Sequence, residues 1–297
     1  MKNRWLLNLV MLTVVAGLVT FLYMRPQANI DAAPQHEVST LKLADFTVIK
    51  VEFPTKAPTS FEKVDGLWRM TAPHKTRADQ LAVQRILSII AAKSTEKFPA
   101  TDLAKFGLDN PRLRLKLTNT AGAQEFVFGT FNPVSEEQYV AFNNAIYLLP
   151  GNYAELASTQ PMELIDKIPL ASGEAKQIAG FDFSRLEQWV DVRLNVDLAE
   201  GKWKVNAPNA KITQNEMNEW LDFSWKQAQA NKVEIYTPDR NAGYPSFDVK
   251  LKNGKSVTFD KIQESPDLLI GRPDEGLMYH FNADAGFNRL NPPLNIK

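Results

Sequence analysis

The stretch GLWRMTAP at residues 66–73 returns as GKWKVNAP at residues 201–208. Both copies place a glycine, a tryptophan, a basic residue and Ala-Pro at the same spacing. In each copy the residues around the tryptophan alternate as they do in a half-buried strand. We therefore expect Trp68 and Trp203 to occupy one structural position used twice, where a large aromatic side chain anchors a helix on a sheet. The functional alternative is that the rings of these two tryptophans stack on a bound carbohydrate.

The two copies stay in register well beyond the tryptophans. Gly107 matches Gly243 at an offset of 136 positions, close to the 135 that separate the tryptophans. A strand then follows at an offset of 134, with the pairs Pro111–Pro245, Leu113–Phe247, Leu115–Val249 and Leu117–Leu251. A two-residue deletion explains the change, because the first copy reads GLDNP where the second reads GYP. Register kept through a turn, a helix and a strand indicates an internal duplication.

Each half predicts several strands and one long helix. Strands are predicted in the first half at 46–53, 60–65, 67–72, 112–117, 125–129, 138–142 and 145–149. Residues 76–93 instead have a helical period, with an apolar stripe at Ala78, Leu81, Ala82, Ile86, Ile89 and Ile90. The second half repeats this order with strands at 177–183, 189–198, 201–208, 247–251, 256–262, 267–271 and 277–281, and with a helix at 212–229 that includes Met217, Trp220, Leu221 and Trp225.

Residues 5–23 (WLLNLVMLTVVAGLVTFLY) form a run without a charge. As a helix this run extends roughly 28 Å, close to the thickness of the hydrocarbon core of a bilayer. Trp5 and Tyr23 stand at its two ends, where amphipathic rings favour the membrane interface. A buried soluble helix and a cleaved signal peptide are the alternatives. The sequence after Tyr23 has no good small-x-small cleavage site, so we expect an uncleaved anchor.

The fold class predicted from these patterns is α+β. An N-terminal transmembrane helix precedes two tandem, duplicated domains, each a mainly antiparallel sheet packed on one long helix. The expected boundaries are a membrane anchor at 1–25, a tether at 26–44, a first repeat domain at 45–155, a connecting segment at 156–174 and a second repeat domain at 175–297. The positive-inside rule places the N-terminus in the cytoplasm of a bacterium, the helix in its inner membrane as a single pass, and the bulk of the chain in the periplasm.

Composition excludes several classes of protein. The 297 residues contain 34 basic and 34 acidic side chains, so no bulk charge favours nucleic acid. The absence of cysteine excludes disulfides, thiolate metal sites, cysteine nucleophiles and a lipid-modified cysteine. The apolar content of 44% is that of a protein with a packed core.

The segment TDLAKFGLDNP at 101–111 contains the signals that begin and end a short helix. Thr101 is expected to cap a short helix, and Gly107 to end it in the left-handed conformation with Leu108 folding back. Together with GLWRMTAP and QYVAF (138–142), FGLDNP closely resembles the bacterial family of domain of unknown function 4340 over about residues 45–297. The resemblance implies a membrane-anchored extracytoplasmic protein, and some members resemble auxiliary proteins of gliding-motility-type ABC transporters. The resemblance carries no reaction, cofactor or catalytic residue.

Chemistry-bearing residues form no known motif. His36, His74 and His280 show no metal-ligand spacing, and serine-hydrolase elbows, phosphate-binding loops and dinucleotide fingerprints are absent. His74 with Lys75, Thr76 and Arg77 could form an anion site at a helix N-terminus, although an exposed loop is the favoured interpretation. The pair at 136–137 (Glu-Glu) is expected to be solvated.

The face formed by Arg112, Arg114 and Lys116 could meet an acidic partner or lipid headgroups, but we expect a solvated strand face. We accordingly expect no catalytic residue, no cofactor and no metal site.

The functional hypothesis is a non-catalytic, membrane-anchored extracytoplasmic scaffold or accessory subunit of an envelope or ABC-type transport assembly. Its expected partners are an inner-membrane or envelope complex, such as an ABC transporter permease, and the lipid bilayer through the N-terminal helix, with no nucleic acid. One alternative is a periplasmic ligand-binding module for glycan, peptide or lipid, which would use an inter-domain cleft lined by Trp189, Trp220 or Trp225. A second alternative is an unrecognised hydrolase.

Overall fold

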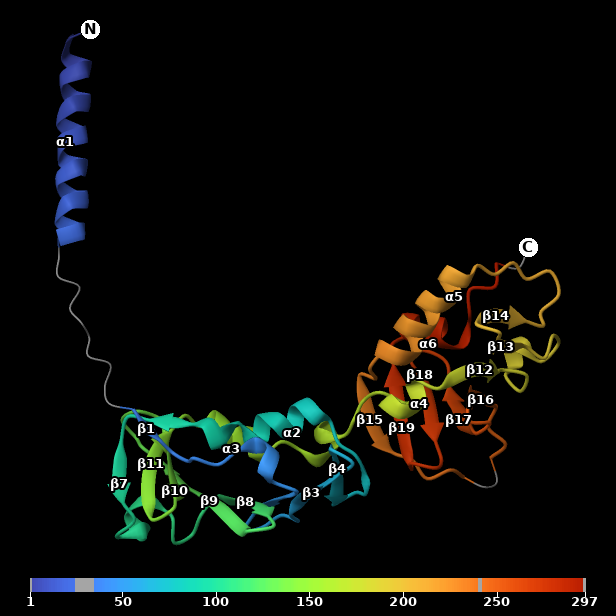
Figure 1. Cartoon of the computed structure of the whole chain (residues 1–297), viewed down its shortest axis with the longest axis horizontal. Coiled ribbons are helices and arrows are strands. Elements are labelled where there is room, and N and C mark those ends of the chain that lie inside the picture. The colour runs from blue at the N-terminus through green and yellow to red at the C-terminus, as the bar shows by residue number, and fades with distance from the viewer. Residues whose placement is uncertain (1, 25–34, 240–241, 296–297) are drawn as a thin grey trace.

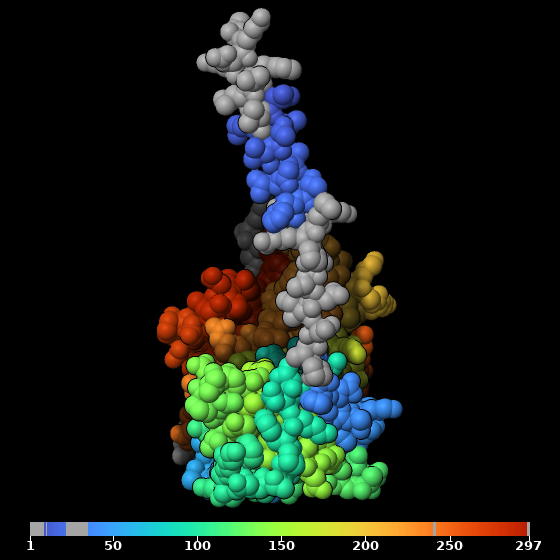
Figure 2. Space-filling model, turned by 90° about the vertical axis from the view of Figure 1, so that its left-hand side faces the viewer, coloured from blue at the N-terminus to red at the C-terminus, as the bar shows by residue number. Residues whose placement is uncertain are grey.

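The computed structural model describes residues 2–24, 35–239 and 242–295. Helix α1 (Lys2–Met24) precedes two folded units (Figure 1). We refer to residues 35–158 as unit 1, to 159–171 as the linker and to 172–295 as unit 2. Figure 2 views the chain from the side of unit 1, with unit 2 behind it. The predicted α+β class with mainly antiparallel sheets is confirmed.

Unit 1 is built on a nine-stranded sheet. Its strands, in spatial order, are β5 (Thr76–Arg77), β4 (Leu67–Ala72), β3 (Thr59–Val64), β2 (Val48–Glu52), β8 (Leu113–Asn119), β9 (Gly122–Phe131), β10 (Gln138–Phe142), β11 (Ala145–Leu149) and β7 (Lys97–Pro99). Each neighbouring pair is antiparallel. Three helical segments, α2 (Gln80–Ile86), η2 (Leu87–Ala91) and α3 (Asn152–Ala157), lie along one side of this sheet (Figure 1).

Unit 2 is built on an eight-stranded sheet. Its strands, in spatial order, are β14 (Lys202–Val205), β13 (Asn195–Ala199), β12 (Ile178–Asp182), β16 (Ser246–Leu251), β17 (Ser256–Gln263), β18 (Leu268–Arg272), β19 (Leu277–Phe281) and β15 (Lys232–Ile235). Its helical segments are α4 (Ser172–Ala175), η5 (Glu187–Trp189), α5 (Gln214–Leu221), a π turn η6 (Asp222–Gln227) and α6 (Ala283–Leu290).

The two sheets have the same order of strands along the chain. Each runs from the strand of the tryptophan through its hairpin partner to the strand that comes first in the chain, then through a four-strand meander, and ends on a short strand that follows the helix. Among the described residues, the two orders differ in the short β5 at the edge of unit 1, which has no counterpart in the sheet of unit 2. Both hairpin turns contain two residues with positive φ, Asp65-Gly66 and Glu200-Gly201, as a tight turn of this kind requires.

The two tryptophans have matching surroundings. Trp68 and Trp203 are 4% and 3% exposed, so the predicted core position is confirmed for both. The backbone of each is bound by the side chain of a glutamine that opens the following helix. Gln80 accepts from the Trp68 N–H at 2.8 Å and donates to its carbonyl at 2.9 Å. Gln214 does the same for Trp203 at 2.7 and 3.0 Å.

Alternation along the strands builds the core of each unit. In β8 the leucines at 113, 115 and 117 are buried, while the residues between them are half-exposed. The core of unit 2 is richer in aromatic rings, and Trp225 packs against Phe181 and Phe247 with ring centroids 5.0 and 5.7 Å apart. Such aromatic pairs stabilise a core beyond the area that they bury.

Both long helices are shorter than predicted. Residues 76–77 belong to β5, and α2 begins only at Gln80 because the side chain of Asp79 caps it, accepting from the backbone N–H of Leu81 and Ala82. Leu81, expected on the apolar stripe, is 64% exposed. The predicted helix at 212–229 begins after its cap Thr213 and changes to the π turn at 222–227.

The end of the 101–111 segment is as predicted, but its start is not. The short 3-10 helix η3 (Leu103–Phe106) has Asp102 as its N-cap, with φ of 54° and no side-chain cap, so the predicted cap by Thr101 is wrong. Gly107 has φ of 66°, and Leu108 folds back with its N–H on the Leu103 carbonyl at 3.0 Å. The left-handed glycine end is therefore confirmed.

Part of the expected tether (26–44) packs against unit 1. Residues 26–34 lie outside the described residues, but β1 (His36–Glu37) pairs with β6 (Lys93–Ser94), and Val38 is 3% exposed. The 3-10 turn η1 (Leu43–Asp45) leads from there into β2. The expected connecting segment at 156–174 likewise contains structure, namely the 3-10 helix η4 (Pro161–Leu164) and α4. Over the part of the chain that the structure describes, no helix is both long and apolar enough to cross a membrane.

Candidate functional site

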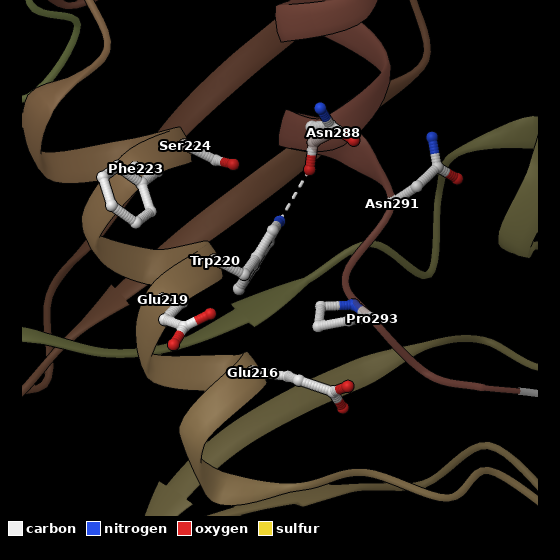
Figure 3. Close-up of a pocket in the computed structure, with 8 residues that line it drawn as sticks. All are labelled: Glu216, Glu219, Trp220, Phe223, Ser224, Asn288, Asn291 and Pro293. Carbon is white, nitrogen blue, oxygen red and sulfur yellow. Dashed lines mark hydrogen bonds between the residues drawn. The ribbon is translucent and has the colours of Figure 1, made fainter.

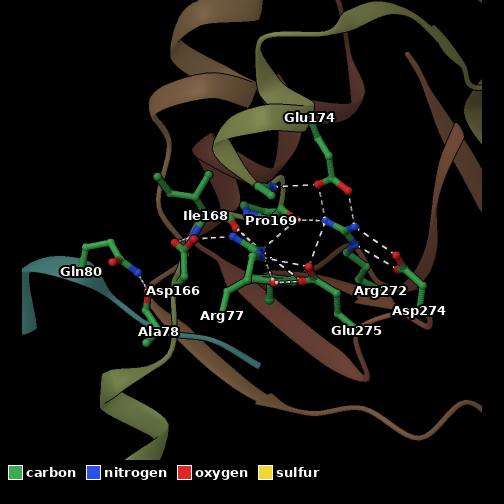
Figure 4. A network of polar contacts seen from close by, with 12 residues as sticks. Arg77, Ala78, Gln80, Asp166, Ile168, Pro169, Glu174, Arg272, Asp274 and Glu275 are labelled. Carbon is green, nitrogen blue, oxygen red and sulfur yellow. Dashed lines mark hydrogen bonds and ion pairs between the residues drawn. The ribbon is translucent and has the colours of Figure 1, made fainter. Parts of the chain in front are cut away.

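A network of polar contacts lies where the two units meet (Figure 4). Three antiparallel contacts bring the linker beside the start of α2: Ala78 forms a bridge with Ile165, the Asp79 N–H donates to the Leu164 carbonyl, and the Asp166 N–H donates to the Arg77 carbonyl. These contacts place the side chain of Arg77 against the β18–β19 turn of unit 2. We call the cluster of Arg77, Asp166, Glu174, Arg272, Asp274, Glu275 and Tyr279 the joint.

Arg77 crosses from unit 1 into the joint and is 8% exposed. Its guanidinium forms an ion pair with Asp166 of the linker. It also donates to both carboxylate oxygens of Glu275, at 2.9 and 3.1 Å, and to the Tyr279 hydroxyl at 3.1 Å. The Ile168 carbonyl accepts a further bond at 2.8 Å. The disfavoured alternative of an anion site that includes Arg77 is therefore wrong, because carboxylates of this chain already bind its guanidinium.

Arg272 forms the other half of the joint and is 2% exposed. It donates to both oxygens of Glu174 at 2.8 and 2.7 Å, and to both oxygens of Asp274 at 3.0 Å. The Pro169 carbonyl of the linker accepts a bond at 2.7 Å. The linker is thus hydrogen-bonded to both guanidinium groups.

The electrostatics of the joint are those of a structural contact. Burial opposes the charge of each arginine, but the bonds to carboxylates outweigh it and raise the pKa of Arg77 and Arg272 above the usual value. Burial also disfavours the ionised form of Glu174, but the bonds from Arg272 prevail and leave its pKa below the usual value. Burial raises the pKa of Asp166, although Arg77 opposes the shift. Carboxylates bound to guanidinium groups in this way hold two parts of a protein together.

A separate groove lies on the outer side of unit 2 (Figure 3). It has a volume of about 290 Å³ and runs between the helix α5 with its π turn on one side and α6 with the following residues on the other. Its lining residues are Glu216, Glu219, Trp220, Phe223, Ser224, Asn288, Asn291 and Pro293. The indole N–H of Trp220 donates to the Asn288 carbonyl at 2.6 Å across the groove. We call this pocket the α5–α6 groove.

Two further pockets lie on or beside unit 1. One of about 420 Å³ is bounded by α2, α3, the linker and Gln229 of unit 2, so it reaches both units. The other, of about 440 Å³, lies between the loop after β2 and α3, and Lys56, Arg112 and Glu155 are among its lining residues.

The structure keeps the histidines apart. His36 lies in β1, His74 in the turn before β5, and His280 in β19, where its Nε2 is 3.0 Å from Glu234. Among the described residues, no group of three or more histidine, cysteine or acidic side chains could hold a metal ion. Glu136 and Glu137 lie in the turn between β9 and β10, where Glu136 is exposed.

The basic strand face is partly paired within its own sheet. Arg114 forms an ion pair with Glu125 at 3.2 Å, and Lys116 lies directly opposite Glu125 on the neighbouring strand. Arg112 instead lies over the ring of Phe131, 5.0 Å from its centroid. These contacts agree with the solvated strand face that the sequence favoured.

The three tryptophans proposed for an inter-domain cleft lie elsewhere. Trp225 is fully buried in the core of unit 2, and Trp189 donates its indole N–H to the Leu290 carbonyl at 2.9 Å. Trp220 lines the α5–α6 groove, which belongs to unit 2 alone. Sequence reasoning missed the joint altogether. The closest signal was the charged turn GRPDEG at 271–276, whose partners stand far away in the chain.

Comparison with known proteins gives a family. The sequence profile of a family described as "Domain of unknown function (DUF4340)" matches residues 68–245. The match begins at the tryptophan of unit 1 and ends at the start of β16 in unit 2, so it includes the linker. No curated protein and no solved structure matches the chain.

Proposed function

Because the chain belongs to the family of domain of unknown function DUF4340, we propose that it is a non-catalytic scaffold or accessory subunit of an envelope or ABC-type transport assembly. In this proposal α1 anchors the chain in the inner membrane of a bacterium, with the N-terminus in the cytoplasm and both units in the periplasm. The partner is an inner-membrane or envelope complex, such as an ABC transporter permease.

The observation that carries the proposal is the joint. Arg77 of unit 1 binds Asp166 of the linker and Glu275 of unit 2, and Arg272 of unit 2 binds the Pro169 carbonyl of the linker. The side chains of Arg77 and Arg272 are only 10% and 3% exposed. The two buried guanidinium groups favour this arrangement, because an arrangement that kept them buried without these carboxylates would leave their charges unpaired. A fixed pair of units is what a scaffold needs in order to present surfaces at constant spacing.

Two features support the anchor and the tandem origin of the units. The exposed apolar side chains of α1 include Met11, Leu12 and Val19, which are 61%, 70% and 59% exposed. A continuous apolar surface on a helix favours a lipid environment. The shared strand order and the matching glutamine bonds to Trp68 and Trp203 support an origin by duplication.

Purification from native membranes tests the proposal. The full chain is tagged at its C-terminus and extracted from bacterial membranes after crosslinking in the cell, with an unrelated single-pass periplasmic protein as the reference. We expect enrichment of a transporter or envelope component over that reference. If no such protein is enriched after crosslinking from both units, the scaffold role is wrong.

A ligand-binding module is the second candidate, and the pocket that reaches both units favours it. Its volume of about 420 Å³ is in the range of small-molecule sites, and Asp79, Arg85, Glu163 and Lys167 give it charges of both signs. Thermal-shift screening with glycans, peptides and lipids tests this role. A stabilising ligand whose effect is lost in Arg85→Glu, but kept in Arg114→Glu, would favour the module over the scaffold.

A further inference from the structure

The surface between the two outer helices is already a binding surface in unit 1. There, the pocket between α2 and α3 is also lined by Glu163, Leu164 and Lys167 of the linker and by Gln229 of unit 2. The α5–α6 groove occupies the corresponding position in unit 2, because α5 and α6 follow the same strands as α2 and α3. Each unit also has a backbone contact between the residues before its helix and a later segment, although the two contacts stand two positions apart in register.

In unit 1 the Asp79 N–H donates to the Leu164 carbonyl of the linker at 2.8 Å. In unit 2 the Lys211 N–H donates to the Leu294 carbonyl of the C-terminal segment at 2.9 Å. The segment after α6 therefore lies along unit 2 as the linker lies along unit 1. The groove beside it, however, keeps large apolar side chains exposed.

Phe223 and Phe287 are 66% and 61% exposed, the first lining the groove and the second on α6 beside it. Exposed aromatic side chains beside a groove are typical of interaction sites. The π turn explains the position of Phe223. It adds a residue to the helical turn, so Phe223 points outward while Trp225 remains fully buried. Unit 1 has a 3-10 turn at this place, with Ile89 and Ile90 buried. π turns occur frequently at functional sites.

The rim of the groove is acidic. Figure 3 shows the carboxylates of Glu216 and Glu219 along the α5 side, below the indole of Trp220. Glu216 accepts from the Thr213 hydroxyl at 2.8 Å, and Glu219 accepts from the Asn215 amide at 2.7 Å. The Asn295 amide also donates to Glu216, at 3.2 Å. All three donors are neutral, so none of them neutralises a carboxylate. The groove therefore combines the apolar side chains of Trp220, Phe223 and Pro293 with neutral polar groups and negative charge.

We propose that the α5–α6 groove docks a basic amphipathic segment of a partner protein. An apolar side chain of that segment enters between Trp220 and Phe223, and a neighbouring lysine or arginine pairs with Glu216 and Glu219. This proposal deepens the scaffold role and depends on that role for the existence of a partner. The docking chemistry itself depends only on the groove.

Two peptides test the docking chemistry. The first is a roughly 15-residue helical peptide of leucine, phenylalanine and lysine with one apolar face, and the second has glutamate at every lysine position. Binding to the full chain in nanodiscs is measured by fluorescence anisotropy, with empty nanodiscs subtracted. We expect the lysine peptide to bind at least about tenfold more tightly than the glutamate peptide, and high salt to weaken it.

Matched variants locate the binding. Glu219→Lys and Phe223→Ser should each weaken the binding of the lysine peptide about tenfold or more. Two control variants should change the affinity for the lysine peptide less than about twofold. Glu200→Lys makes the same charge change at a side chain outside the groove that is 90% exposed, and Leu81→Ser removes an exposed apolar side chain from the helix of unit 1. Circular dichroism and thermal unfolding confirm that the variants fold. Equal binding by wild type and both groove variants overturns the proposal.

The same variants separate this proposal from the scaffold role. A native partner that is lost in Glu219→Lys and Phe223→Ser supports both. A partner that is enriched equally with wild type and with both groove variants keeps the scaffold role and overturns the groove as its docking site. Groove-dependent binding of the lysine peptide without any enriched native partner supports the docking chemistry and overturns the scaffold role.

Discussion

Replacing Arg77 with alanine removes the guanidinium that joins unit 1 to unit 2. Asp166 and Glu275, whose side chains are 27% and 19% exposed, then lose their main countercharge. Removing one partner of a buried ion pair costs roughly 3–5 kcal/mol. Arg272 lies 3.5 Å from Glu275 and compensates part of the loss. We therefore expect Arg77→Ala to lower the free energy of unfolding by about 3 kcal/mol, at the lower end of that range.

The same change should loosen the arrangement of the two units. The chain has no cysteine, so one cysteine in each unit gives two unique labelling positions. Val134 and Glu200 suit this purpose, since both side chains are 90% exposed and one stands in each unit. Distances between spin labels at these positions should form a narrow distribution in the parent chain and a broad one in Arg77→Ala.

An exposed ion pair provides the control. Arg114→Ala breaks a contact with Glu125 in which the side chains are 37% and 33% exposed, and such pairs contribute roughly 0–1 kcal/mol. Chemical denaturation and the label distances should both stay near those of the parent chain. The reasoning about the joint is refuted if Arg77→Ala costs no more than Arg114→Ala and leaves the distance distribution narrow.

Three other predictions concern pH, the tryptophan positions and a glycine. The pKa of Glu174 is lowered in the folded state, so its contribution to stability should be fully present above its ordinary pKa and should be lost as the pH falls from that value through the lowered pKa of the folded state. Glu174→Gln should flatten this acid limb in denaturation measured from about pH 3 to 7, and an unchanged limb would contradict the prediction. Trp68→Ala and Trp203→Ala should each lower the free energy of unfolding by about 3–5 kcal/mol in the same denaturation assay. A loss below about 1 kcal/mol for either variant would show that the two positions are not alike. Gly107→Ala should lower the free energy of unfolding by about 2–3 kcal/mol, because a Cβ there meets a threonine of β9. Gly66→Ala is equally left-handed but faces open space, so it should cost about 1 kcal/mol. Equal shifts in thermal unfolding for the two variants would exclude the steric explanation.

Helix boundaries show where sequence reasoning reached its limit. The apolar stripe correctly marked Ile86, Ile89 and Ile90 as buried, yet it also included Leu81, which is exposed. The capping bonds of Asp79 shift the first turn of α2, and the change from α2 to a 3-10 turn alters the face that later residues present. A pattern of fixed period cannot record such a change of helical pitch.

The sequence alone determined the features that depend on neighbours in the chain. Alternation placed the leucines of β8 inside, and Gly107 ended its turn in the left-handed region. Only the tertiary structure decided the joint and the α5–α6 groove. Arg77 meets its carboxylate partners 89 and 198 positions away, and the groove exists only because α6 packs beside the π turn. Local rules act over a few residues, whereas a buried charge finds its countercharge only once the chain has folded.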